Sequence, residues 1–203
     1  MAIFTYGQKE IEHLRKKDKQ LGQAIDRIGM LEPGVTSDLF SALVNSIIAQ
    51  QISGKAAETV WNRVKERFVE VTPERFSSAT VEEVQGCGMS MRKAGYIKGM
   101  ADACIRGDMD LDALWALPDE EVVERLSSLR GIGVWTAEMI LIFCMQRPDI
   151  VSWNDLGIRR RMMRLYGLDE LGRADFDRYR KRYSPYGTIA SFYLWKMNDG
   201  GTD

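Results

Sequence analysis

The chain has 203 residues, of which 45% are hydrophobic, and this is enough apolar material for one good core or for two small cores that share an interface. Its cysteines, Cys87, Cys104 and Cys144, are odd in number and widely spaced, which argues against a disulfide framework and favours a reducing compartment. The N-terminus becomes charged before an apolar region develops, and the longest strongly apolar run, MILIFCM (139–145), is too short to cross a bilayer. We therefore expect neither a signal peptide nor a membrane span.

The net charge of −1 and the pI near 6.0 argue mildly against a nucleic-acid partner. The distribution of charge points the other way, because residues 156–182 contain nine basic side chains against four acidic ones, a local excess of five. A run such as RRRMMR within this stretch is compatible both with a solvated helical face and with a basic surface for nucleic acid.

The first predicted helix covers TSDLFSALVNSIIAQQ (36–51), in which apolar pairs recur every four residues, the spacing of one buried helix face. Ser37 is expected to be its N-cap. The next stretch, SGKAAETVWNRVKERF (53–68), repeats this arrangement with Ser53 as the cap. Its predicted buried stripe consists of Ala57, Val60, Trp61, Val64 and Phe68.

Helical patterns continue to the C-terminus. Thr80 and Glu83 have the spacing of a capping box, and Trp115 is expected in the core. Later helices are predicted at 90–106, 119–128, 134–146, 155–166, 174–182 and 186–197. No stretch shows sustained alternation with period two, so the predicted fold class is all-α. The sequence has no low-complexity segment, linker or internal repeat, and any division into two lobes must therefore be non-contiguous.

The stretch LRGIGVWTAEM (129–139) places Gly131 and Gly133 on either side of Ile132, between two predicted helices. Glycine permits positive φ and lets another backbone approach closely. A short turn at a helix N-terminus leaves outward N–H groups that suit an anion such as phosphate. An ordinary helix C-cap followed by a tight turn is the commoner explanation of such a pattern. A dinucleotide-binding loop is disfavoured because no strand precedes the glycines.

The hairpin LRGIGVWTA resembles that of the helix-hairpin-helix (HhH-GPD) DNA glycosylase superfamily, Leu-Pro-Gly-(Ile/Val)-Gly-x-x-Thr-Ala, with Arg130 in place of the usual proline. The similarity extends over residues 36–198, and GIGxWTA is most similar to the 3-methyladenine DNA glycosylase II branch. Four further stretches follow the family's order: IIAQQIS (47–53), MSMRKAGYIKGMA (89–101), VSWNDLGIRR (151–160) and YSPYGTIASFYLW (183–195).

The resemblance implies a two-lobed, all-α fold with the DNA and base pocket in the cleft between the lobes, in a short form without an N-terminal β-domain. Lobe A is expected at about 36–118, and lobe B at about 1–35 together with 119–203.

Asp155 occupies the position of the family's catalytic aspartate. An ionised carboxylate there would stabilise the positive charge that develops on the sugar and orient the attacking water. Asn154 and Asp155 are also both good N-cap residues, and capping alone would explain an aspartate here without any catalytic role. Where family members that nick the backbone place a lysine, this chain has Trp135, which implies a monofunctional enzyme.

The resemblance assigns further roles to residues outside the catalytic position. Trp135, Tyr186 and Trp153 are candidates for the base pocket, with core packing as the alternative for each ring. Gly131, Ile132, Gly133 and Thr136 are candidates for binding the DNA backbone. Gln51, with Gln50 beside it, is the candidate wedge that fills the space of the flipped base, although either residue suits a helix end equally well. Gly187 stands where some relatives have arginine.

The resulting hypothesis is a hydrolase of base excision repair that removes 3-methyladenine and 7-methylguanine from duplex DNA and leaves an abasic site. The alternatives are a glycosylase for hypoxanthine or uracil, and a non-catalytic protein that binds DNA structure through the hairpin. We expect no cofactor: no cysteine follows Cys144 to hold an iron–sulfur cluster, and His13 is the only histidine. Binding of a monovalent or divalent cation by the backbone carbonyls of the hairpin remains an alternative.

We expect a monomer whose partner is double-stranded DNA with alkylated bases, with no membrane partner. Its expected location is the cytoplasm, on the nucleoid in a prokaryote, or the nucleus in a eukaryote.

Overall fold

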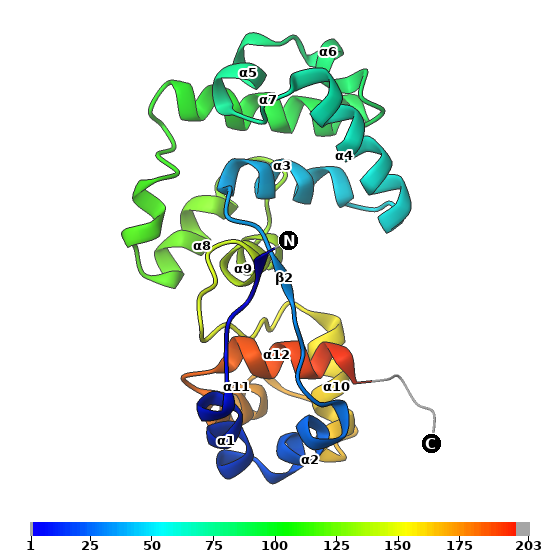
Figure 1. Ribbon diagram of the computed structural model, residues 1–203. Helices are drawn as coiled ribbons and strands as arrows, with labels where there is room; N and C mark the ends of the chain where they lie inside the picture. The colour runs from blue at the N-terminus through cyan, green and yellow to red at the C-terminus, as the bar shows by residue number, and fades with distance from the viewer. Residues whose placement is uncertain (1, 198–203) are drawn as a thin grey trace. The chain divides into compact units, whose positions relative to one another are not determined.

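The computed structural model describes residues 2–197, which are helical for the most part (Figure 1). The all-α prediction is confirmed, since the strands among these residues are two residues each, β1 (Ala2–Ile3) and β2 (Gly34–Val35), paired antiparallel. The chain forms two compact units. We call Thr36–Ile140 the central unit, and Met1–Val35 together with Leu141–Asp203 the terminal unit.

The division between the units differs from the expected lobes. The sequence analysis assigns residues 119–140 to lobe B, whereas the structure groups them with the central unit. One contact within this grouping is the hydrogen bond that Gln50 donates to the carbonyl of Gly131 at 2.7 Å. The terminal unit is formed by two separate segments of the chain.

The central unit is built around helix α7, which packs against α3, α5 and α6, while α3 packs against α4. Its elements are α3 (Leu39–Ala49), α4 (Gly54–Phe68), α5 (Pro73–Ser78), α6 (Val81–Gln85), α7 (Met91–Ile105), the 3-10 helix η1 (Ala113–Ala116), α8 (Asp119–Ser127) and the first part of α9 (Val134–Phe143). Helix α9 thus ends three residues before the predicted end at 146.

Side-chain caps begin several of these helices. Ser53 caps α4, and Thr80 with Glu83 forms a capping box on α6, as predicted. The cap of α3 is Asp38 and not Ser37, because the helix begins at Leu39 and the Asp38 carboxylate accepts from the Ser41 amide at 2.6 Å.

The predicted stripe of α3 is buried, and that of α4 is buried in part. In α4 Ala57, Val60 and Val64 are buried, whereas Trp61 and Phe68 are only half-buried. Leu43, Val44, Ile47 and Ile48 of α3 are fully buried. The expectation for Trp115 is wrong, since its side chain is 41% exposed. In the short 3-10 helix the neighbouring Leu114 takes the buried position instead.

The terminal unit contains α1 (Gln8–Lys17), α2 (Lys19–Ile28), α10 (Leu156–Tyr166), α11 (Arg173–Tyr183), α12 (Gly187–Lys196) and the end of α9. Helices α1 and α2 were not predicted, because their charged faces obscure a narrow apolar stripe. That stripe is nevertheless buried, through Ile11, Leu14, Leu21 and Ile25. Helix α12 is buried from Gly187 to Leu194 and packs against α2, α10 and α11.

A buried carboxylate links three parts of the terminal unit. The Asp18 side chain is 1% exposed and caps α2 by accepting from the Leu21 amide at 2.9 Å. It also accepts from the Tyr166 hydroxyl at 2.8 Å and from the Arg182 guanidinium at 3.2 Å. Burial raises the pKa of the Tyr166 hydroxyl, and this group therefore remains a donor to the carboxylate.

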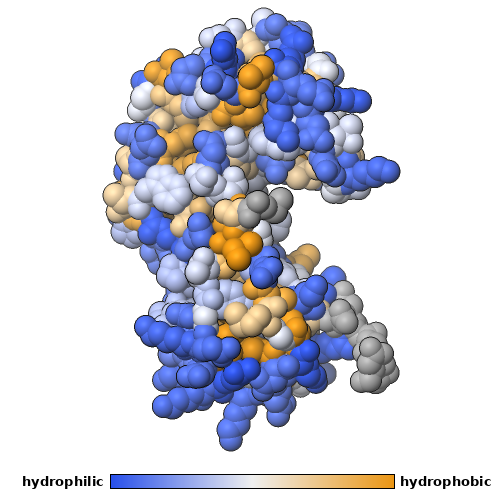
Figure 2. Space-filling model, in the orientation of Figure 1, coloured by the Kyte–Doolittle hydropathy of each residue, from blue (hydrophilic) through white to orange (hydrophobic). Residues whose placement is uncertain are grey.

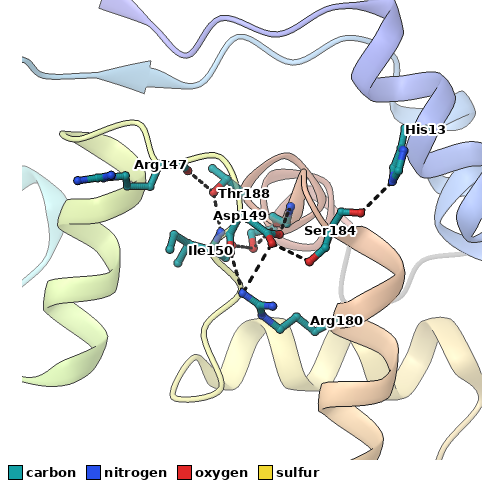
Figure 3. A network of polar contacts seen from close by, with 9 residues as sticks. His13, Arg147, Asp149, Ile150, Arg180, Ser184 and Thr188 are labelled. Carbon is teal, nitrogen blue, oxygen red and sulfur yellow. Dashed lines mark hydrogen bonds and ion pairs between the residues drawn. The ribbon is translucent and has the colours of Figure 1, made fainter. Parts of the chain in front are cut away.

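The segment before α10 is anchored to the start of α12 (Figure 3). The Asp149 carboxylate accepts from the Ser184 hydroxyl at 2.6 Å and from the Gly187 amide at 2.9 Å. The Thr188 hydroxyl donates to the Arg147 carbonyl at 2.6 Å and accepts from the Ile150 amide at 3.0 Å. These bonds fix the segment that leads to Asp155.

Gly187 is a glycine because its surroundings leave no room for a side chain. A Cβ at this position would lie 2.6 Å from Asp149 Oδ1 and 2.8 Å from Val151 Cγ2. The arginine that some relatives have here would therefore not fit without a change at Asp149.

Gly187→Ala is expected to lower the free energy of unfolding by about 1–3 kcal/mol, because the methyl group overpacks a buried site. Urea unfolding followed by circular dichroism measures this change. The matched control is Gly99→Ala in α7, where a Cβ meets no atom within 4 Å and alanine should stabilise the helix by up to about 1 kcal/mol. Equal behaviour of the two variants would contradict the packing explanation.

Asp18→Ala is expected to cost about 2–4 kcal/mol, because α2 loses its N-cap and the half-buried Tyr166 hydroxyl and the partly exposed Arg182 guanidinium lose their acceptor. Asp38→Ala removes an exposed cap of the same chemistry and should cost about 0.5–2 kcal/mol. Thermal and urea unfolding of both variants check the ranking, which a similar loss in the two would overturn.

Candidate functional site

The predicted site residues are divided between the two units, and each unit is described by itself. The central unit holds Gln50, Gln51, Gly131, Ile132, Gly133, Trp135 and Thr136. The terminal unit holds Trp153, Asp155 and Tyr186.

The two hairpin glycines have different structural reasons. Gly131 has a φ of +92°, and a Cβ there would overlap the Tyr96 ring, 2.9 Å from its Cγ. Gly133 has no positive φ, and a Cβ there would meet no protein atom within 4 Å. The expectation of a left-handed conformation thus holds for Gly131 only, and the fold itself leaves open space at Gly133. Ile132 is 4% exposed and anchors the turn.

The start of α9 presents Trp135 outward. Its side chain is 45% exposed, so the alternative of core packing does not describe this ring. Thr136 is 8% exposed and Ala137 fully buried, which directs the next residues into the core.

The loop between α3 and α4, residues 50–53, is called here the wedge loop. Gln51 is exposed and has a φ of +58°, a conformation that costs energy for any residue other than glycine and is common at functional sites. Ile52, which the sequence analysis missed, is 41% exposed. The available signal was an apolar isoleucine directly after two glutamines at the end of a predicted helix, because apolar side chains often serve as wedges between bases.

Gln50 does not extend outward as the wedge prediction requires. Its Nε2 donates to the Gly131 carbonyl at 2.7 Å, and Lys93 Nζ donates to the carbonyls of Ile48 at 2.8 Å and of Gln50 at 2.6 Å. Burial and the neighbouring Arg92 lower the pKa of Lys93. The amide of Gln50 is thus engaged inside the protein, and the outward positions of the wedge loop are Gln51 and Ile52.

Asp155 is the N-cap of α10, as the sequence predicts. Its Oδ1 accepts from the Ile158 amide at 2.8 Å, and the residue is 8% exposed. A carboxylate at a helix N-terminus interacts favourably with the helix dipole, which stabilises its negative charge. The cap also fixes the orientation of the carboxyl group.

Gly157 gives the Asp155 carboxylate its space. A Cβ at Gly157 would lie 2.9 Å from Asp155 Oδ1 and 3.7 Å from Cδ1 of Trp195. The sequence analysis did not select this residue. The signal was a glycine in the first turn of a predicted helix, where it costs about 1 kcal/mol relative to alanine.

The two aromatic candidates of the terminal unit both have packing partners. The Trp153 ring meets Phe176 edge to face at 5.2 Å, and the guanidinium groups of Arg159 and Arg173 lie 4.8 and 5.4 Å from its centroid. The Tyr186 ring is half-buried and meets the His13 ring edge to face at 5.1 Å. Of the two rings, Trp153 therefore has more packing partners within its own unit.

The basic excess of residues 156–182 is partly neutralised within the protein. The ion pairs of this stretch include those of Arg173 with Asp177, Arg178 with Asp175, Arg180 with Asp149 and Arg182 with Asp18. The face in Figure 2 is hydrophilic for the most part, with scattered hydrophobic patches. Large apolar side chains that are at least 41% exposed occur in the wedge loop, at the start of α9 and at the start of α10. They are Ile52, Val134, Trp135 and Leu156.

Within residues 2–197, no three histidine, cysteine, aspartate or glutamate side chains are grouped as a metal site would require. No helix of this part of the chain has the length and apolar character of a membrane span.

The sequence matches known DNA repair proteins. Residues 44–184 match the family model of HhH-GPD superfamily base excision DNA repair proteins. DNA-3-methyladenine glycosylase 1 of Schizosaccharomyces pombe is 31% identical over 97% of this chain and 90% of its own length. The DNA-3-methyladenine glycosylase of Saccharomyces cerevisiae is 29% identical over 84% of this chain and 70% of its own length.

Solved structures show the same fold. The DNA-3-methyladenine glycosidase of Bacillus halodurans superposes with a TM-score of 0.84 at 33% identity, over 97% of this chain and 92% of its own. S. pombe Mag1 in complex with abasic DNA gives 0.79 at 29% identity, over 96% and 100% of the two chains. From its sequence and its helical architecture, this chain belongs to the HhH-GPD superfamily of base excision DNA repair proteins.

Proposed function

We propose that the protein is a monofunctional DNA glycosylase that hydrolyses the N-glycosidic bond of 3-methyladenine and 7-methylguanine in duplex DNA and leaves an abasic site. The observation that carries this proposal is Asp155, a nearly buried carboxylate held at the start of α10. The names of the relatives from S. pombe and S. cerevisiae support the choice of lesion.

Asp155 would act on the charge that develops during bond cleavage. As the base departs, positive charge builds on the deoxyribose, and a fixed carboxylate stabilises that transition state more than the neutral ground state. Burial strengthens this interaction because less water screens it. The capping bond to Ile158 holds the carboxylate in one orientation, which also suits it to align the attacking water.

The hairpin and Trp135 would bind the damaged strand and its base. Open space at Gly133 allows a phosphate to approach the backbone at the start of α9. The exposed indole of Trp135 suits a flipped, positively charged purine, since such cation–π contacts contribute about 0.5–2 kcal/mol. Tyr186 is the second candidate ring, and Gln51 with Ile52 would fill the space left in the stack.

The chemistry at position 135 predicts the form of the product. A tryptophan has no amine to form a Schiff base with the sugar, so the DNA backbone stays intact after base release. Strand breaks should therefore appear only after alkali treatment.

Asp155→Asn should lower single-turnover release of 3-methyladenine and 7-methylguanine from methylated duplex DNA by at least about 100-fold. Asparagine is as good an N-cap as aspartate, so α10 should remain intact and the loss should reflect the missing charge. Asp38→Asn, at the cap of α3, is the matched control and should release bases at the wild-type rate. Chromatography of the free bases, with gel analysis before and after alkali, measures both properties.

Each other outcome contradicts a defined part of the proposal. Normal base release by Asp155→Asn would exclude the stated mechanism. If the wild type releases no methylated base, duplexes with hypoxanthine or uracil test for another lesion. Binding without release from any of these substrates would favour a protein that recognises DNA structure.

Gly157→Ala tests the space around the carboxylate. The added methyl group should displace the Asp155 side chain and lower kcat about tenfold or more, because small misplacements of a catalytic group are costly. The affinity for DNA with an abasic-site analogue should stay within about twofold of wild type, because the substitution affects the catalytic carboxylate and not the binding surface. Gly99→Ala is the matched control, and an equal loss of kcat in it would overturn the explanation.

A further inference from the structure

The wedge loop and the hairpin are joined by one side chain. The residues concerned, Gln50 and Gly131, are 81 positions apart, and the Gln50 amide donates to the Gly131 carbonyl at 2.7 Å. The two segments that the proposed function assigns to the lesion strand and to the base stack therefore share a direct hydrogen bond within the central unit.

Helix α7 holds both ends of this bond. Lys93 donates to the carbonyls of Ile48 and Gln50, which fixes the backbone where α3 ends. Tyr96, nearly one turn further along α7, packs against Gly131 so closely that a Cβ there would overlap its ring. The Gln50 backbone and the Gly131 backbone thus have a common support.

The outer part of the wedge loop has little other support. Gln51 and Ile52 are both exposed, and a hollow of about 270 Å³ lies between the loop and the first residues of α7. Gln51 also has a left-handed backbone, which persists only where neighbouring contacts impose it. The bonds made by Gln50 and Lys93 fix the chain immediately before Gln51.

We propose that Gln50 is a positioning residue that couples the wedge loop to the hairpin, so that phosphate binding at the hairpin fixes Gln51 and Ile52 against the base stack. This inference rests on the proposed function. It replaces the expectation that Gln50 itself enters the DNA. Through this coupling, binding energy gained at the hairpin contributes to unstacking of the lesion. Unstacking is needed for base release but not for binding of the DNA itself.

The variant Gln50→Met keeps the length of the side chain and removes its donor. In single-turnover assays it should release 7-methylguanine about tenfold more slowly than wild type when the lesion is paired with cytosine. When the lesion lies opposite an abasic-site analogue, it is already unpaired. The release rate of the variant should then be within about twofold of the wild-type rate. Gln85→Met on α6 is the matched control and should behave as wild type on both duplexes.

A second readout follows base flipping without chemistry. In the Asp155→Asn background, 2-aminopurine next to the paired lesion reports unstacking, and adding Gln50→Met should reduce its fluorescence gain. Affinity for duplex DNA with a tetrahydrofuran site should be unchanged, because no base has to leave the stack. Gln50→Leu, which also removes the donor and adds no charge beside the hairpin, should reproduce both results and guards against a folding defect peculiar to methionine.

Three results would overturn the coupling. These are equal slowing on paired and unpaired lesions, a matching loss of affinity for the tetrahydrofuran duplex, and wild-type behaviour of both Gln50 variants. Failure of the proposed function looks different, because the wild type would then release no 7-methylguanine, while the fluorescence and binding measurements still report on the coupling.

Discussion

The burial of α12 is the constraint on which the terminal unit depends. From Gly187 to Leu194 every residue is buried, so α2, α10 and α11 must all pack around it. The polar groups of its first turn are satisfied by the segment that contains Asp149, which places that segment against the helix. Asp155 follows directly, and the position of the carboxylate is therefore set by the core of its unit and not by a free loop.

The central unit solves a similar problem with α7. This helix packs against three neighbours, and its polar side chains reach the ends of other segments. Lys93 satisfies carbonyls at the end of α3, and Tyr96 covers the hairpin glycine. A repair protein of this kind needs loops that are exposed to DNA yet fixed in position, and side chains from one central helix meet both requirements.

Features that depend on neighbouring residues could be predicted from the sequence. The caps at Ser53, Thr80 and Asp155 and the turn at Gly131 follow from local hydrogen bonding and backbone conformation, which a short stretch encodes. The motif order indicated the family for the same reason.

Features that depend on distant residues could not be predicted. The bond of Gln50 to Gly131 spans 81 positions, and that of Gly187 to Asp149 spans 38. No local pattern reveals either bond, and the outward Trp115 likewise depends on what its neighbours leave uncovered. The apolar stripes of α1 and α2 are narrow and lie among charged residues. They stabilise the helices only by packing against other helices, which the local sequence does not show.

The contact between Asp149 and Gly187 also restricts how this protein can evolve. The carboxylate occupies the space that a side chain at 187 would need, so the arginine found in some relatives is not reachable by one tolerated substitution. Replacement of the acid would leave the Gly187 amide and the Ser184 hydroxyl without their acceptor. Because Val151 Cγ2 also lies 2.8 Å from the position of such a Cβ, a side chain at 187 requires changes at both 149 and 151.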